Sequence, residues 1–139
     1  MNIDKLKHQH MDIHACIVTL RNLAKGGIVH NAEEISKQIV AMSSIIKLHL
    51  AVEDKILYPA LQRSGNAAVA GMGEKYQREM EGIASAYVDF ARRWNTAVNV
   101  AQKPEEFRAD ANRVLKVLHG RMSQEESEFY PAVEKLGLL

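Results

Sequence analysis

The chain has 139 residues, of which 47% are apolar and 25% are charged, the usage of one ordinary globular domain spanning residues 1–139. Its formal net charge of +1 gives no basis for binding to nucleic acid or to an acidic membrane surface. The only cysteine, Cys16, excludes an internal disulfide and fits the cytoplasm, while a polar start and the lack of about 18 consecutive apolar residues predict neither a signal peptide nor a membrane span.

Apolar side chains recur at steps of three and four residues, the pattern of helices that face a bundle core. The first stripe covers residues 3–24 and stops at the sequence KGG, a helix-ending signal. Asn31 is expected to cap the second helix, with Glu34 as its capping-box partner. The stripe of this second helix covers residues 35–56.

Two further helices follow the sequence RSGN at residues 63–66. The third stripe covers residues 76–94, and the fourth covers residues 107–129 after Pro104, a residue suited to the first turn of a helix. Nothing in the chain has the pattern of a strand. Because short connections favour antiparallel neighbours, the sequence predicts an all-α, up-down-up-down four-helix bundle.

An eleven-residue frame occurs twice, as HLAVEDKILYP at residues 49–59 and as RMSQEESEFYP at residues 121–131. Each copy has a glutamate five residues before a Tyr-Pro pair, with a second acid beside it. Pro59 and Pro131 are expected to kink or end their helices at equivalent places. The two frames differ at their first residue, which is a histidine in one and an arginine in the other.

Six residues stand out on the apolar stripes because they are ligand-like or polar. They are His10, His49, Glu53, Met80, Arg121 and Glu125. Burial of polar groups is costly unless they are paired or coordinate an ion. The spacing His49-x-x-x-Glu53 places an imidazole and a carboxylate one turn apart on one helix face, where they could hold one metal ion.

This arrangement resembles the hemerythrin-like (HHE cation-binding) family over about residues 3–136. The resemblance implies a four-helix bundle with a non-haem di-iron centre, held by histidines and carboxylates from all four helices. It also implies oxygen binding, oxygen or redox sensing, or iron handling. The positions that match the family's ligands are His10, His49, Glu53 and Glu125.

The sequence departs from the family pattern in its second half. Met80 and Arg121 stand where the resemblance places the histidines of the third and fourth helices. We therefore predict at most one bound metal. His14 follows His10 by one helical turn and is a candidate additional ligand, whereas His119 lies two residues before Arg121 and should point away from that position.

Two functions remain open at this stage. In the first, His10, His49 and Glu53, completed by Glu125 or His14, bind one Fe(II), or zinc, for oxygen or redox sensing or metal storage. In the second, a metal-free structural or interaction module uses the Arg121 guanidinium in place of a metal, donating to Glu53 and Glu125. No nucleophile elbow, phosphate loop or Cys–His pair indicates an enzyme. The sequence identifies no protein partner.

Overall fold

The computed structural model describes residues 3–136. No strand occurs within these residues, so the predicted all-α class is confirmed. The elements are α1 (Ile3–Lys25), α2 (Ala32–Val52), the π-helical turn η1 (Glu53–Leu57), α3 (Tyr58–Gln62), α4 (Ala67–Trp94), α5 (Ala97–Gln102), α6 (Pro104–Gln124), the π-helical turn η2 (Glu125–Phe129) and α7 (Tyr130–Lys135).

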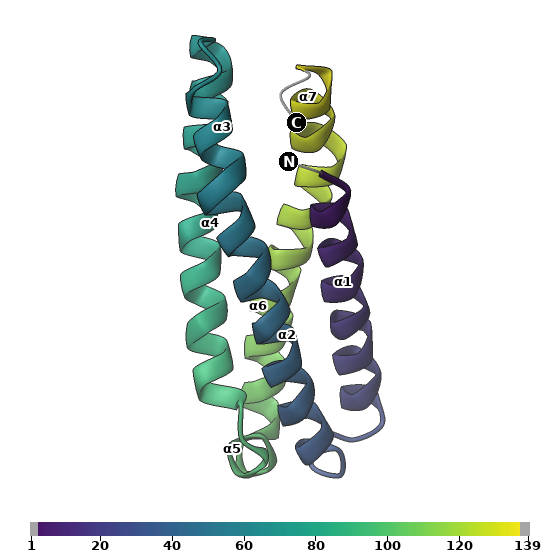
Figure 1. The fold of residues 1–139 in the computed structure, drawn as a ribbon. Helices are drawn as coiled ribbons and strands as arrows, with labels where there is room; N and C mark the ends of the chain where they lie inside the picture. The colour runs from purple at the N-terminus through teal and green to yellow at the C-terminus, as the bar shows by residue number, and fades with distance from the viewer. Residues whose placement is uncertain (1–2, 137–139) are drawn as a thin grey trace.

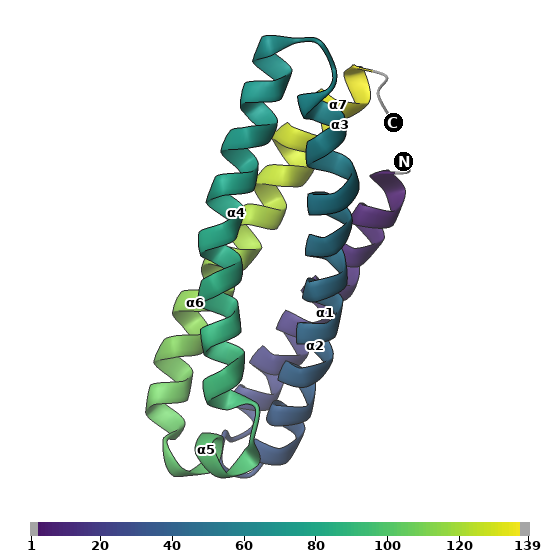
Figure 2. The same cartoon turned by 60° about the vertical axis from the view of Figure 1, so that its left-hand side comes forward.

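Long helical rods lie side by side in Figures 1 and 2. They are α1, the run from α2 to α3, α4, and the run from α6 to α7. The beginning of α1, α3 and α7 lie toward one end of the molecule, and α5 and the turn between α1 and α2 lie at the other end (Figure 1).

The turn between α1 and α2 differs in one detail from the sequence prediction. α1 ends at Lys25, and Gly27 has a positive φ of 117°, which suits glycine. Asn31 precedes α2, but its side chain makes no cap of that helix and instead donates from Nδ2 to the carbonyl oxygen of Leu23 at 2.9 Å. The predicted capping box with Glu34 is therefore wrong, because the Asn31 amide is used to satisfy a carbonyl at the end of α1.

The helices do not end at the two prolines, because a π-helical turn precedes each Tyr-Pro pair. η1 begins at Glu53 and η2 begins at Glu125, so the two halves widen at equivalent places. The backbone N–H of the following tyrosine donates to the carbonyl of that glutamate, five residues earlier. Helix then continues through Pro59 to Gln62 and through Pro131 to Lys135.

The π turn also shifts the phase of the apolar stripe. Ile56, which the sequence places on the stripe, is 46% exposed, whereas Leu57 is fully buried. Five residues of α-helix rotate a side chain by about 140° from its starting direction, but the wider i→i+5 turn brings it back toward the same face. Tyr58 and Tyr130 are consequently buried on the side of the helix that carries Glu53 and Glu125.

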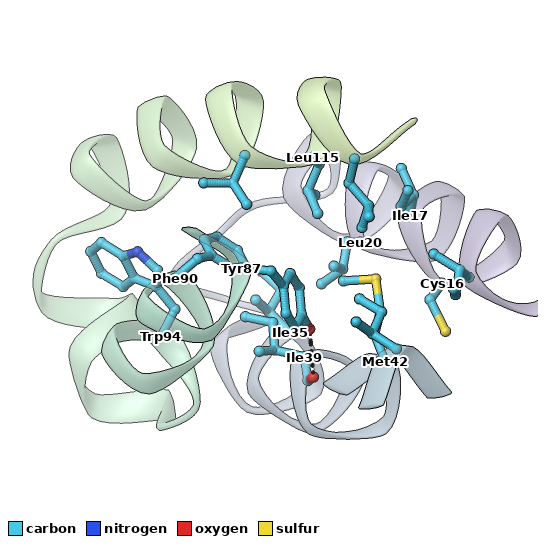
Figure 3. Close-up of a cluster of buried hydrophobic side chains, with 14 of the residues drawn as sticks. Cys16, Ile17, Leu20, Ile35, Ile39, Met42, Tyr87, Phe90, Trp94 and Leu115 are labelled. Carbon is cyan, nitrogen blue, oxygen red and sulfur yellow. Dashed lines mark hydrogen bonds between the residues drawn. The ribbon is translucent and has the colours of Figure 1, made fainter. Parts of the chain in front are cut away.

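The apolar core consists of two clusters of buried side chains. Figure 3 shows part of the larger one, in which the hydroxyl of Tyr87 donates to the carbonyl oxygen of Ile39 at 3.1 Å. The smaller cluster lies toward the other end of the long helices, and its buried members are Ile3, Leu6, Leu57, Tyr58, Leu61, Val69, Tyr76, Phe129, Tyr130 and Val133.

Buried polar residues lie between these two clusters. On α1, for example, Gln9 and His10 follow Leu6 of the smaller cluster and precede Ile13 of the larger one. Along α2 with η1, and along α6 with η2, the order is reversed: the larger cluster comes first, then buried polar residues, then the smaller cluster. A polar layer therefore crosses the bundle and separates the two apolar regions.

One helical run, Ala32–Gln62, is long and apolar enough to cross a membrane by length and composition alone. The core helix of a soluble protein passes the same test. In this structure Ile35, Ile39, Met42 and Ile46 of that run are buried in the larger apolar cluster.

Candidate metal centre

All six residues singled out on the stripes are buried, with at most 5% of each residue exposed. Three of them bring ligand atoms together from three helical segments: His10 on α1, His49 on α2 and Glu125 at the start of η2. His10 Nε2 lies 3.2 Å from His49 Nε2 and 2.9 Å from Glu125 Oε1. The distance from His49 Nε2 to Glu125 Oε1 is 3.8 Å.

These three distances fit a shared cation. The point equidistant from the three atoms lies about 2 Å from each of them, which is the length of a typical bond from a metal to a histidine nitrogen or carboxylate oxygen. The donor set of two imidazoles and one carboxylate is also one that iron and zinc accept. The residues present therefore fit a metal ion by their separation and by their chemistry.

The outer nitrogens of both rings are held by acceptors. His49 Nδ1 lies 2.8 Å from Gln9 Oε1, and His10 Nδ1 lies 3.1 Å from Glu126 Oε1. A carbonyl and a carboxylate oxygen accept hydrogen bonds, so with a bound cation each ring can donate from Nδ1 and direct its Nε2 lone pair inward. Two lone pairs and a carboxylate oxygen then face one another, an arrangement that a cation stabilises.

Tyr130 completes the polar surroundings of His10. Its hydroxyl lies 3.1 Å from His10 Nε2 and donates to Glu125 Oε1 at 3.4 Å. Burial and then the nearby charge of Glu125 raise the pKa of Tyr130 far above its usual range, so this phenol remains a donor. The π turn of η2 is what brings Tyr130 to this side of its helix.

The pKa values of the two glutamates of the repeat are shifted in opposite directions. Burial raises the pKa of Glu53 well above its usual value, and the charge of Glu125 adds to this effect. For Glu125, burial alone would raise the pKa, but contacts to both histidines outweigh it. Glu53 and Arg121 also contribute, so the pKa of Glu125 lies well below its usual range. Glu125 is thus the anion of the pair.

Both oxygens of Glu53 are buried, and neither accepts a hydrogen bond from a described residue. Its Oε1 lies 3.3 Å from His49 Nε2, but it is not one of the three residues whose ligand atoms converge. A buried carboxyl group that accepts no hydrogen bond is unfavourable for folding. A metal ion bound to the neighbouring His49 could also be coordinated by this carboxylate.

We expect Glu53→Gln to raise the melting temperature of the metal-stripped protein at pH 7. Folding raises the pKa of Glu53, so its contribution to stability becomes less favourable as the pH rises above the unfolded pKa of about 4.3. Above that pH the carboxyl is ionised in the unfolded chain, and folding must either bind a proton or bury the charge. The neutral amide removes this dependence. Thermal unfolding of both proteins between pH 4 and 8 should show a gain that disappears toward pH 4.

The matched control is Glu125→Gln, which removes the ionised member of the pair and should lower the melting temperature. If both substitutions lower it equally at pH 7, Glu53 is not the uncharged member of the pair.

Arg121 occupies the second half of the polar layer. Its Nε donates to Glu125 Oε2 at 3.3 Å, so the two oxygens of this carboxylate face different groups. Its Nη2 donates to the Tyr76 carbonyl at 2.8 Å and to the Tyr58 hydroxyl at 3.4 Å. The guanidinium lies over the Tyr76 ring at 4.6 Å, and Nη1 lies 3.6 Å from Glu79 Oε2.

This pairing differs in part from the sequence prediction. The Arg121–Glu125 contact is present, but no hydrogen bond joins Arg121 to Glu53 in the described part of the chain. The other contacts of Arg121 are made by Tyr76 and Glu79 on α4 and by Tyr58 on α3.

Comparison with protein families agrees with this geometry, because the model of the Hemerythrin HHE cation binding domain matches residues 1–133. The chain belongs to the hemerythrin family. No curated protein and no solved structure matched the chain. Within this hemerythrin domain, Met80 is buried and Arg121 is held by α4, whereas His10, His49 and Glu125 are grouped together.

The structure does not bring His14 to the buried group. Its residue is exposed on α1, and its ring lies against that of His119, with a centroid separation of 5.4 Å. His14 follows His10 by four residues, which rotate the side chain by about 40° beyond a full turn. At the edge of the apolar stripe this rotation is enough to place His14 in solvent. His119 is exposed as well and points away from Arg121, as the sequence predicts.

Three residues that contact the ligand candidates were not predicted from the sequence, namely Gln9, Glu126 and Tyr130. Each is adjacent to a residue of interest: Gln9 precedes His10, Glu126 follows Glu125, and Tyr130 belongs to the repeated Tyr-Pro pair. The shared second acid of the two frames was the available signal for Glu126. The contacts themselves join residues 40 to 120 positions apart.

Proposed function

We propose that this hemerythrin domain is an up-down-up-down antiparallel bundle that binds one iron ion and acts as a cytoplasmic, non-catalytic module for sensing oxygen or redox state or for storing metal. The observation that supports this proposal is the convergence of His10, His49 and Glu125 on a point at metal-bond distance from all three. His10 and His49 are oriented by Glu126 and Gln9, which gives the centre outer partners typical of metal sites.

The donor set favours ferrous iron among the metals that these ligands accept. Two histidines and one carboxylate are the ligands of non-haem Fe(II) sites, and zinc fits them as well. When bound, ferrous iron with three protein ligands would offer open coordination positions to a small molecule such as dioxygen. Glu53, beside His49, would serve as a further carboxylate ligand.

The same structure supports a limit of one ion. Glu125 Oε2 and the carbonyl of Tyr76 are used by the Arg121 guanidinium, which already supplies a positive charge to the second half of the polar layer. Met80 offers only a weak thioether donor where a histidine would be needed. A second ion would therefore have to compete with a buried cation.

Arg121 also supports the second candidate function, a metal-free structural or interaction module. Its contacts to Glu125, Tyr76 and Tyr58 satisfy part of the polar layer without any metal. In that case the protein would have retained the fold of the family and replaced the metal with an ionic contact.

The experiment that distinguishes the two functions is anaerobic titration of the metal-stripped protein with Fe(II) and, separately, Zn²⁺. We expect about one ion per chain, a higher melting temperature with metal, and loss of both effects in His10→Gln/His49→Gln. The control is His8→Gln/His30→Gln, which removes two exposed histidines. No retention of metal by the unmodified protein would favour the metal-free module, and two tightly held irons would contradict the limit of one.

A further inference from the structure

A second group of potential ligands lies on the surface between α1 and α6. A cavity of about 250 Å³ is lined on the α1 side by His10, Met11 and His14, and on the side of α6 and η2 by His119, Met122, Ser123 and Glu126. Nitrogen, thioether and carboxylate groups thus border one pocket.

The two surface histidines have the separation of imidazoles that share an ion. Their ring centroids are 5.4 Å apart, with an interplanar angle of 41°. Two rings bound to one tetrahedral metal through nitrogens at about 2.0–2.1 Å have centroids about 5 Å apart. His14 and His119 come from different helices, so packing of α1 against α6 produces this pairing.

The pocket is also connected to the buried centre. His14 lies one helical turn, about 6 Å, along α1 from His10, and His10 lines the inner wall of the pocket. Glu126 lines the same pocket with its side chain half exposed, and its carboxylate contacts His10 Nδ1 at 3.1 Å. Glu126 therefore joins the pocket to Nδ1 of His10, the residue whose Nε2 faces the buried centre.

We propose that His14 and His119 form a surface site that captures divalent transition-metal ions and delivers them past Glu126 to the buried centre. The capture step stands on the geometry of the two histidines alone. The delivery step rests on the proposed function, because it requires that the buried centre takes up metal. Imidazole and thioether groups at the mouth of the pocket suit late transition metals such as zinc and copper.

Capture is tested in a His49→Gln background, which weakens the buried centre. Calorimetric titration with Zn²⁺ should show one site whose affinity falls by about tenfold or more when His14→Gln/His119→Gln is added. The matched control, His8→Gln/His30→Gln in the same background, should leave the affinity unchanged. Sub-stoichiometric Cu²⁺ should selectively broaden the imidazole NMR signals of His14 and His119. Equal loss of affinity in both double variants, or broadening of other histidines instead, would overturn the assignment.

Delivery is tested by the rate at which the otherwise unmodified, metal-stripped protein takes up Zn²⁺ from a chromophoric chelator. The variant His14→Gln/His119→Gln should load its buried centre about tenfold more slowly while reaching the same final amount of tightly held metal. An unchanged rate would overturn delivery. If the buried centre takes up no metal, delivery fails together with the proposed function, whereas the capture titration still decides whether the surface histidines bind.

Discussion

Replacing Arg121 with methionine should lower the free energy of unfolding of the metal-stripped protein by about 3–5 kcal/mol, the usual cost of removing one member of a buried ion pair. The substitution leaves Glu125 without its cation and removes the side-chain donor that the Tyr76 carbonyl and the Tyr58 hydroxyl share. Methionine has a similar length and helix propensity, so the loss reports on these contacts. Urea denaturation at pH 7 measures it directly.

The control for this experiment is Arg92→Met on α4. The Arg92 side chain is 77% exposed and its ion pair with Asp89 spans 3.8 Å, so its removal should cost less than about 1 kcal/mol. Equal denaturation midpoints for Arg121→Met and the unmodified protein would show that the guanidinium contributes nothing to the polar layer.

The double substitution Met80→His and Arg121→His should create a second metal position. It gives the second half one histidine on α4 and a His-x-x-x-Glu pair on α6 and η2, as in the first half. Removal of the guanidinium leaves the acids of the layer without a cation, so that binding of a divalent ion would contribute to folding. We expect two irons per chain after anaerobic reconstitution with Fe(II). The melting temperature should be clearly higher with metal than without it, since an ion at 100 times its dissociation constant stabilises by about 2.7 kcal/mol.

The single variant Met80→His is the matched control, because it adds the histidine but retains the Arg121 cation. It should bind no more iron than the unmodified protein. A double variant that folds but takes up no second iron would show that Met80 and Arg121 do not occupy lost ligand positions.

The sequence was sufficient to predict the long helices, because apolar periodicity over twenty residues is a strong signal. It failed where one side chain had alternative partners or where the backbone left the α-helical period. Asn31 is a residue type that commonly caps helices, yet its side-chain amide donates to the carbonyl oxygen of Leu23. The π turn η1 shifts the buried position from Ile56 to Leu57. Pro59, two residues later, indicates that the regular α-helix is interrupted but does not reveal that helix continues beyond it.

The candidate site was predictable to a similar degree. His10, His49 and Glu125 could be selected because polar groups on an apolar stripe are conspicuous. His14 was misplaced because a residue at the edge of a stripe can face either the core or solvent, and the choice depends on the neighbouring helix. The pairing of Glu126 with His10 could not be predicted, since it depends on how α1 and η2 are aligned between residues 116 positions apart in the chain.

The polar layer between the two apolar clusters also determines how the helices are aligned lengthwise. In a purely apolar bundle, a helix that slides by one turn, about 5.4 Å, would still place apolar side chains against apolar neighbours. Such a slide in this protein would carry His10 or Glu125 into an apolar layer and separate Arg121 from its acceptors, leaving buried polar groups unpaired at a cost of several kcal/mol. The residues that could hold a cation therefore also make one longitudinal alignment of the bundle more stable than its neighbours.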